Sequence, residues 1–231
     1  MKLQFGKAFH TLLPSLMDGI GVVVYITLIG FILSLIVGLL LAVGRKSRSK
    51  VLNVILGAFV ELIRGTPLLV QFFYIYYVIP AIVNGIADSM GYISNFQIDA
   101  AICGIIGFAI NYGCYMSEVI RAAIIAIDPG QREAGLALGF SEGQVMRNFV
   151  IPPAIRNSFP VFGNYLVMMI KDTSLLAMIS VQELLLRTKT YASQTFQTVE
   201  SYTIVALVYL ALSIVFSQIS KLVERRLSKK G

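Results

Sequence analysis

Long apolar runs separated by short polar segments make up most of this chain. The run Gly19–Gly44 contains no charged residue and would extend roughly 39 Å as a helix, at about 1.5 Å per residue, which is enough to cross a hydrocarbon core of about 30 Å. Comparable runs follow, and we expect spans at Gly19–Gly44, at Val51–Ile63 continued by Leu68 to about Val83, at Asp99 to about Ile127, at Pro153–Ile170 continued by Leu175–Val181, and at Ser201–Ser220. The pattern predicts an all-α membrane protein with about five transmembrane helices.

Polar segments mark where the predicted helices end. A turn-rich loop over Pro80–Gln97 follows the second span, and the turn Asp128-Pro129-Gly130 follows the third. We expect the residues before about Leu16 to form a short external segment, and Gln182–Glu200 to form an external polar stretch. Because no linker or internal repeat divides the sequence, we expect a single transmembrane domain over residues 1–231, with its core at about residues 19–220.

The composition agrees with a membrane protein. Hydrophobic residues make up 57% of the chain, charged residues make up 13%, and the mean hydropathy is +0.79, which excludes a soluble globular domain. The net charge of +7 would suggest nucleic-acid binding in a soluble protein, but here the basic residues lie at the ends of apolar runs. They form two clusters, Arg45/Lys46/Arg48/Lys50 and Lys221/Arg225/Arg226/Lys229/Lys230, whereas Pro80–Gln97 has no Lys or Arg. We therefore expect a multi-pass cell-membrane protein with an external N-terminus, a cytoplasmic C-terminus and no nucleic-acid partner.

Few residues suit catalysis or metal binding. Cys103 and Cys114 would lie roughly 16 Å apart along one helix, so they cannot form a disulfide with each other. His10 is the only histidine in the sequence, and neither a metal-ligand cluster nor a pair of catalytic carboxylates accompanies it. We expect no metal site and a chain that is not an enzyme.

The segment Arg132–Pro153 is polar although its neighbours are apolar. Its spacing is typical of a short amphipathic helix, with Gly135 and Gly139 four residues apart on one face. Two glycines one turn apart leave no side-chain bulk, so another backbone can approach that face closely. Such a helix at the cytoplasmic side of a membrane protein suits contact with a soluble partner.

This segment also resembles part of a known family. Glu133-Ala134-Gly135, Gly139 and Ile151-Pro152 are similar to the EAA loop of binding-protein-dependent ABC transporter permeases, although Gly135 replaces the more frequent second alanine and Pro153 stands where a polar residue is usual. The stretches ELIRGTPLLVQFF, YMSEVIRAAIIAIDPGQREAG and IKDTSLLAMI resemble the polar amino-acid subgroup of these permeases. The four stretches follow one another in order across most of the chain.

The resemblance implies several partners. Glu133, Ala134, Gly135 and Gly139 would dock on a cytoplasmic ABC ATPase subunit. This chain has no G-x-x-x-x-G-K-[ST] loop to bind phosphates, so ATP–Mg would be bound by that separate subunit, and we expect no cofactor in this chain. The resemblance also implies a second permease subunit, identical or closely related, and an extracytoplasmic substrate-binding protein.

The third predicted span carries candidates for a substrate path. Asn111, Tyr115 and Glu118 share one helix face, and polar residues on a membrane helix are expected to face the protein interior or a water-filled path. Glu118 has two interpretations, which do not exclude each other. Its carboxylate binds the ammonium group of an amino acid, or it pairs with Arg121 one turn below.

A polar interruption in the second span adds further candidates. Thr66 and Pro67 resemble a helix start, whose free N–H groups suit a substrate carboxylate. The alternative is a kink that shapes a cytoplasmic gate, with Arg64 paired to Glu61. Gln71 and Tyr74 would continue the polar side of the following helix.

A similar interruption occurs in the fourth span, where Lys171, Asp172, Thr173 and Ser174 follow one another. Adjacent opposite charges at membrane depth are costly unless they have partners or water. Any of the last three residues would serve as the cap of the next short helix. The family resemblance implies that this segment lines the translocation path.

These observations favour one function class over two others. An ion-gradient-driven secondary transporter of amino acids is disfavoured because no internal repeat is present and the EAA segment would have no purpose, and nothing supports a membrane-embedded enzyme. The few acids and bases in the membrane region are balanced, which suits a zwitterion. The sequence therefore predicts the permease subunit of an ATP-driven ABC importer for amino acids, with polar amino acids, basic amino acids and cystine left open as substrates.

Overall fold

The computed structural model describes residues 3–45, 47 and 49–228, and this part of the chain folds into helices joined by short connections. Four residues of the two basic clusters, Lys46, Arg48, Lys229 and Lys230, lie outside the described residues. In chain order the elements are α1 (Phe5–Gly44), α2 (Lys50–Arg64), α3 (Leu68–Phe73), the π-helical turn η1 (Tyr74–Val78), α4 (Ile79–Ser89), α5 (Ala100–Ile125), α6 (Pro129–Ala137), α7 (Glu142–Val145), the π-helical turn η2 (Met146–Val150), α8 (Ile151–Asp172), the 3-10 segment η3 (Thr173–Ile179), α9 (Leu184–Thr195) and α10 (Thr198–Ser228).

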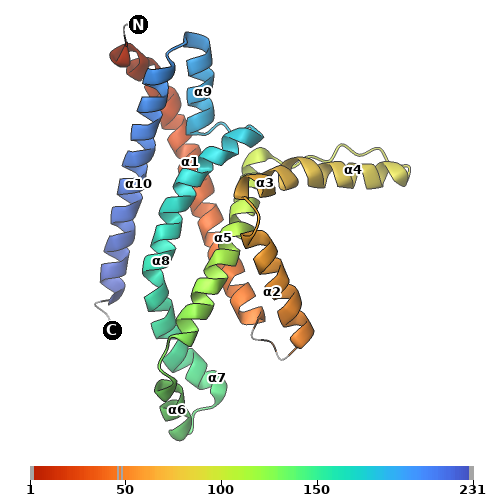
Figure 1. Ribbon diagram of the computed structural model, residues 1–231, viewed down its shortest axis with the longest axis vertical. Helices are drawn as coiled ribbons and strands as arrows, with labels where there is room; N and C mark the ends of the chain where they lie inside the picture. Colours follow the sequence, from red (N-terminus) through yellow and green to blue (C-terminus); the bar gives the residue numbers. More distant parts are fainter. Residues whose placement is uncertain (1–2, 46, 48, 229–231) are drawn as a thin grey trace.

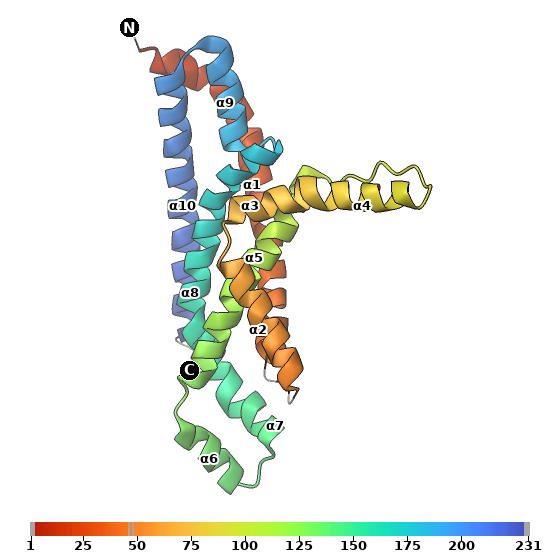
Figure 2. The ribbon, with the colours of Figure 1, turned by 45° about the vertical axis from the view of Figure 1, so that its right-hand side comes forward.

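Four long helices form an elongated bundle. Helices α1, α5, α8 and α10 run along the long axis of the molecule, as Figures 1 and 2 show. The small helices α6 and α7 lie at one end, whereas α9 and the N-terminus lie at the other. Helices α3 and α4 project sideways from the middle of the bundle, across its long axis.

The number of membrane spans agrees with the sequence prediction. Within the described residues, four helical stretches are long and apolar enough to cross a membrane: Phe5–Gly44, Leu68–Ser89, Ala100–Ile125 and Thr198–Arg226. The bent pair formed by Glu142–Ile179 and Leu184–Thr195 brings the number to as many as five. The prediction of an all-α protein with about five spans is therefore confirmed.

Tight contacts between small residues hold α1 against α5. A Cβ atom built at Gly38 would lie 2.9 Å from the Cβ of Met116 and 3.1 Å from the carbonyl oxygen of Gly113. Glycine at these positions lets two backbones approach closely, as is common between membrane helices. Near the centre, Phe72 of α3 packs edge-on against Phe108 of α5, and both rings are fully buried. The α1–α5 pair is therefore a firm support for the residues that α5 carries.

The N-terminal segment is part of the first long helix, which begins at Phe5 and not at the expected Gly19. Helix α1 begins at Phe5 and continues through Pro14 without a break. Ala8, Leu12 and Leu16 are buried in one cluster with Ile204 and other apolar residues. Their spacing of four residues places them on one helix face, and the packing of this face extends the helix beyond the predicted span.

The predicted loop over Pro80–Gln97 is also partly wrong. Its first half belongs to α4, and the non-helical connection covers only residues 90–99. The π turn η1 directly precedes the first turn of α4, which contains Pro80. Proline is tolerated there because its missing N–H and its ring fall where regular α-helical hydrogen bonding is already interrupted.

The expected external polar stretch contains a helix that the sequence prediction missed. Helix α9 begins after Glu183, whose fully buried carboxylate accepts hydrogen bonds from the backbone N–H groups of Leu185 and Leu186 and from the hydroxyl of Tyr209. Ser180, just before this turn, has a left-handed backbone with φ of 68°. Glu183 therefore acts as a buried N-cap that joins α9 to α10.

Candidate functional site

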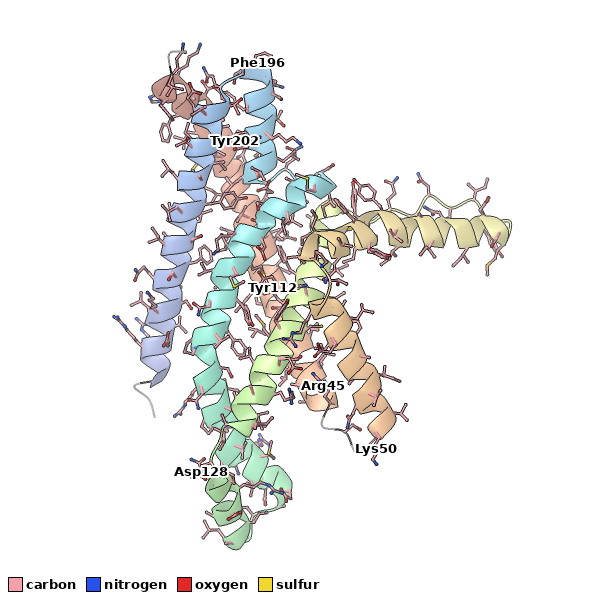
Figure 3. All side chains as sticks on the ribbon, in the orientation of Figure 1. Arg45, Lys50, Tyr112, Asp128, Phe196 and Tyr202 are labelled. Carbon is pink, nitrogen blue, oxygen red and sulfur yellow. The ribbon has the colours of Figure 1, made fainter. Side chains whose placement is uncertain are left out.

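A polar cavity of about 620 Å³ lies between the α2–α3 junction, α5 and α8. Tyr112 of α5, labelled in Figure 3, marks its place in the middle of the bundle. The cavity is lined by Arg64, Gly65, Thr66, Pro67, Leu68, Asn111, Tyr112, Tyr115, Tyr165, Met168 and Asp172. It therefore combines a guanidinium, a carboxylate, an amide and three phenol hydroxyls at one place.

The guanidinium of Arg64 forms the positive part of this cavity. It pairs with Glu61 at 3.5 Å and lies 5.3 Å from the ring centroid of Tyr115. Its Nε atom is buried and has no hydrogen-bond partner among the described residues. A buried donor without a partner is costly, and an anionic ligand in the cavity would supply the missing acceptor.

The carboxylate of Asp172 forms the negative part. The hydroxyl of Tyr112 donates a hydrogen bond to its Oδ2 atom at 2.6 Å. The ring of Tyr112 in turn packs edge-on against that of Tyr165, with centroids 5.9 Å apart. Asp172 is only partly buried and therefore keeps acceptor positions for a second donor, such as an ammonium group.

Gln71, which was predicted to lie on the polar side of α3, holds the α2–α3 junction. The side-chain amide of Gln71 donates to the carbonyl oxygen of Ile63 at 2.7 Å and to the hydroxyl of Thr66 at 2.9 Å. Its amide oxygen accepts from Asn111 at 3.1 Å. These bonds tie the break in the chain to α5. Asn111 lines the cavity, whereas Gln71 lies outside the lining and holds Asn111 from behind.

The prediction that Thr66 caps the following helix is wrong. Its hydroxyl donates backward, to the carbonyl oxygens of Leu62 and Ile63 at the end of α2. Pro67 occupies the N-cap position of α3 in an extended conformation and, because it has no polar side chain, forms no side-chain cap. The alternative, a kink with Arg64 paired to Glu61, is what the structure shows.

Glu118 lies outside the residues that line the cavity, although it shares a helix with Asn111 and Tyr115. Its carboxylate binds Arg121 at 2.8 Å and also pairs with Arg45, which follows the end of α1. The predicted ion pair with Arg121 is thus present. The contact with Arg45 was missed, because the sequence does not show that the basic turn after α1 reaches α5.

The interruption at residues 171–174 is milder than predicted. The chain passes from α8 directly into the 3-10 segment η3, and Asp172 forms no side-chain cap. The hydroxyl of Thr173 donates back to the carbonyl oxygen of Ile170 at 2.6 Å. Of the four predicted residues only Asp172 lines the cavity, while Lys171 is exposed and Ser174 is partly buried.

Two other predicted path residues differ in their placement, and several lining residues were not predicted. Tyr115 lines the cavity, and its hydroxyl reaches the carbonyl oxygen of Arg64 at 3.4 Å, whereas Tyr74 is 57% exposed and lies outside the lining. The lining residues that were not among the predicted path residues are Arg64, Gly65, Pro67, Leu68, Tyr112, Tyr165 and Met168. Tyr165, Met168 and Asp172 are spaced three and four residues apart, which is the signal that places them on one face of α8.

The segment Arg132–Pro153 forms two short helices rather than one, so the predicted shared face of Gly135 and Gly139 is wrong. Gly135 lies in α6, where an added Cβ would come within 2.9 Å of Val145 in α7. Gly139 lies between the helices with φ of 84° and has open space around its Cβ position. The first glycine therefore permits internal packing, and the second permits the turn.

The two short helices are fixed by polar contacts. The carboxylate of Asp128 accepts from the N–H of Gly130 at 2.8 Å at the start of α6, and Ser141 and Gln144 form a capping box at α7. Arg132 and Glu142 form an ion pair between α6 and α7. Glu133 and Ala134 remain exposed on this small hairpin, which lies at the end of the bundle in Figures 1 and 2.

Comparison with known proteins identifies the family. The family described as "Binding-protein-dependent transport system inner membrane component" matches residues 30–229. The glutamine transport system permease protein GlnP of Escherichia coli K12 is 34% identical over 226 residues, covering 97% of this chain and 99% of GlnP. The probable amino-acid ABC transporter permease protein PatM of Vibrio harveyi is 35% identical over 218 residues, covering 94% of each.

Solved structures agree with this result. A structure described as an amino acid ABC transporter with histidines aligns with a TM-score of 0.85 at 32% identity, covering 98% of this chain and 100% of that chain. The MetNI methionine ABC transporter, at 17% identity and a TM-score of 0.70, shares the fold. The chain belongs to the family of binding-protein-dependent transport system inner membrane components, and it is a multi-pass membrane protein.

Proposed function

We propose that the chain is the permease subunit of an ATP-driven ABC importer for amino acids and forms the path through which the substrate crosses the membrane. The observation that carries this proposal is the polar cavity, which holds the charges of Arg64 and Asp172 at two walls within a membrane bundle. Relatives named as glutamine and amino-acid permeases support the same substrate class. No observation favours the ion-gradient-driven alternative.

In this proposal the two charges bind the two ends of a zwitterion. Arg64 binds the substrate carboxylate through its unpaired Nε, and Asp172 binds the substrate ammonium group. Tyr112 orients the Asp172 carboxylate through its hydrogen bond, and Asn111 and Tyr115 provide polar contacts from α5. Glu118, already bound by two arginines, supports the structure instead of contacting the ligand.

The α6–α7 hairpin is proposed to be the coupling segment. Its exposed residues Glu133 and Ala134 would contact the cytoplasmic ATPase subunit, which binds ATP–Mg, while Gly135 and Gly139 keep the hairpin compact. This assignment places the C-terminus on the cytoplasmic side and the N-terminus outside, since the two lie toward opposite ends of the bundle.

Two further partners complete the proposed importer. A second permease subunit, identical or closely related, would provide a second hairpin for a second ATPase subunit. The apolar side chains that α2 exposes, among them Val54 and Leu62, suit burial in such an assembly. An extracytoplasmic binding protein would deliver the substrate at the α9 end.

The binding mode can be tested on the purified complex with a panel of amino acids and two blocked analogues. A methyl ester removes the substrate carboxylate charge, and an N-acetyl group removes the ammonium charge. Arg64→Gln should weaken binding of the free amino acid about 10-fold or more and should not further weaken binding of the ester, because charged hydrogen bonds are worth about 1.5–3 kcal/mol. The control Lys171→Gln, at an exposed lysine outside the lining, should leave binding unchanged.

If Arg64→Gln lowered the affinity for the free amino acid and for its methyl ester equally, Arg64 would not be the residue that binds the substrate carboxylate. Transport by vesicles that contain this chain but no ATPase subunit would instead contradict the ABC assignment, and would favour a secondary transporter. The two outcomes are independent, since the first concerns the ligand contact and the second concerns the energy source.

A further inference from the structure

A second concavity, which is apolar, lies between α1, α5, α8 and α10. It has a volume of about 630 Å³, and its walls include Phe31 and Leu39 of α1, Ile124 of α5, Phe159 of α8 and Val223 of α10. On α8 it uses residues 151–166, mostly on a different face from Tyr165, Met168 and Asp172 of the polar cavity. The two sites are therefore distinct, and we call this one the apolar groove.

Only two of the residues that line the groove carry hydroxyl groups, Ser158 and Ser220. Ser158 is buried, and its hydroxyl donates to the carbonyl oxygen of Ala154 at 2.8 Å, so this donor is already used. The other wall residues named above, apart from Ser220, carry only hydrocarbon side chains. A concave apolar surface within the membrane-spanning part of a protein favours a hydrocarbon occupant.

The groove has the depth of one membrane leaflet. Its wall extends from Phe31 to Val43 on α1 and from Ile151 to Leu166 on α8, which corresponds to roughly 18 Å and 22 Å at about 1.5 Å per residue. Half of a hydrocarbon core of about 30 Å is about 15 Å. An extended acyl chain that enters from the membrane surface would therefore lie along most of the groove.

Basic residues lie close in sequence to the wall residues at the end of the groove nearest α6 and α7. Arg147 precedes the wall residue Ile151 by one turn, and Arg226 follows the wall residue Val223 by three positions on α10. Lys221 adds another exposed positive charge on α10, and Glu224 is the acidic residue next to it on this helix. On α1 and α5, Arg45 and Arg121 are held by Glu118. The surplus of positive charge favours an anionic headgroup at this end.

We propose that the apolar groove binds one acyl chain of an anionic phospholipid, with its phosphate held by Arg147 and Arg226. The hydrocarbon walls bind the chain, and the two guanidinium groups select the headgroup charge. This proposal goes beyond transport and needs only that the protein is embedded in a bilayer. A result against it leaves the proposed transport function untouched.

The sequence allows a direct test because it contains no tryptophan, so an introduced one is the sole indole. Phe159→Trp places it in the groove wall, and Ile214→Trp places it on an exposed part of α10 outside the lining. Each full-length variant is reconstituted in phosphatidylcholine vesicles, with increasing amounts of either brominated phosphatidylglycerol or brominated phosphatidylcholine. Bromine quenches tryptophan fluorescence only on contact, so quenching reports which lipid occupies the site.

We expect half-maximal quenching of Phe159→Trp at an about tenfold lower fraction of brominated phosphatidylglycerol than of brominated phosphatidylcholine, given two headgroup cations. Ile214→Trp should show no preference between the two lipids. Adding Arg147→Gln and Arg226→Gln to Phe159→Trp should abolish the preference, whereas the matched control Lys50→Gln, at the start of α2, should retain it. Filling the groove with Ala154→Phe should protect the indole from both lipids.

Three results would overturn the proposal. The first is equal quenching by the two lipids at Phe159→Trp, and the second is a preference that survives loss of both arginines. The third is that neither lipid quenches the indole of Phe159→Trp while a second copy of the chain stays stably bound. The occupant of the groove would then be a protein. Leu39→Trp, on the α1 wall, repeats the test if Phe159→Trp does not fold.

Discussion

At the scale of single residues, the charged groups of the membrane region fall into two sets with different surroundings. Arg64 and Asp172 lie at a cavity, and each keeps unused hydrogen-bonding capacity there. Arg45 and Arg121 both bind the carboxylate of Glu118 away from that cavity. A charge that is already neutralised by its neighbours gains little from a ligand, so the two sets should respond differently to substitution.

Asp172→Asn should weaken uptake about 10- to 100-fold. It removes the proposed partner of the substrate ammonium group while keeping a side chain of the same shape, and a hydrogen bond to a charged group is worth about 1.5–3 kcal/mol. The measurement is substrate uptake by reconstituted complex, with basal ATPase activity as the check on assembly. Uptake equal to that of the exposed neighbour variant Lys171→Gln would exclude Asp172 from the path.

Glu118→Gln should lower stability more than it lowers uptake per folded molecule. The change leaves Arg45 and Arg121 without their acceptor charge, and a cation stranded in a partly buried site is destabilising. Tm in detergent would be measured in two double-mutant cycles, with Arg45→Gln and with Arg121→Gln. The coupling should be larger for Arg45, since the Arg121 side chain is 49% exposed. Loss of uptake with an unchanged Tm would instead make Glu118 a ligand contact.

At the scale of elements, the most informative details are glycines whose roles differ. Gly38 allows α1 to touch α5, Gly135 allows α6 to touch α7, and Gly139 allows the chain to reverse between two short helices. The sequence showed where small residues occur, but a helix contact and a turn both use glycine. Only the backbone angles and the neighbouring atoms separate these cases.

Gly38→Leu should destabilise the protein by about 1–3 kcal/mol, because a larger side chain at this crossing forces α1 away from Met116 and Gly113. The matched control is Gly21→Leu on the same helix, where an added Cβ meets no atom within 4 Å. The measurement is the thermal or denaturant midpoint in detergent. Similar midpoints for the two variants would contradict tight α1–α5 packing.

Gly139→Gln should uncouple substrate transport from ATP hydrolysis. A left-handed backbone costs a non-glycine residue about 1–2 kcal/mol, so the substitution should distort the turn that orients α6 against α7. Gly139→Asn should be tolerated better, because asparagine adopts this conformation more readily. The measured quantity is substrate transported per ATP hydrolysed.

The prediction for Gly139→Gln has a control variant and an outcome that would contradict it. Gly143→Gln, at an open position in α7 with an ordinary backbone, is the control and should remain coupled. If Gly139→Gln behaves like this control, the shape of the turn does not matter for coupling, and the proposed role of the hairpin fails.

The sequence predicted the existence of the long helices because they combine length and hydrophobicity, and some of them also have clear end signals. Asp99 is such a signal, since its carboxylate caps α5 as its position before the helix suggests. The connections were harder to predict. Pro80 looked like the start of a loop but lies in α4, and Gln182–Glu200 was expected to be an external polar stretch but contains α9. In both cases packing or a local π turn outweighed the preferences of single residues.

The site was predicted in part for the same reason. Asn111 and Tyr115 were found because they share a face of one helix, whereas Tyr112 was missed because it lies beside that face. The Arg45–Glu118 contact joins residues 73 positions apart in the chain. No periodicity within one helix reports such a contact, and only the packing of α1 on α5 creates it.

At the scale of the whole molecule, the single chain exposes many apolar side chains outside the bundle. The sideways α3–α4 arm and α2 carry several of them, including Tyr77, Ile82 and Ile86 on the arm. Lipid covers part of this surface in a membrane. An arm that projects across the long axis of the bundle also offers a large area to a neighbouring subunit.

We predict two permease chains in the working complex, either two copies or one copy with a close relative. Under the proposed function one hairpin per chain would serve one ATPase subunit, so a pair of ATPase subunits would need two chains. Mass measurement of the detergent-solubilised complex should give equal numbers of permease and ATPase subunits. A stable, active complex with one permease chain per two ATPase subunits would refute this arrangement.

The two charged residues of the polar cavity belong to different structural parts, since Arg64 ends α2 and Asp172 ends α8. Under the proposed binding mode, a zwitterion can contact both residues only at one distance between α2 and α8. Any rearrangement that lengthens this separation breaks one contact and leaves the substrate held at one end only. The affinity for the substrate would then fall although both residues remain in the site. Movement of the helices would thus directly cause release of the substrate.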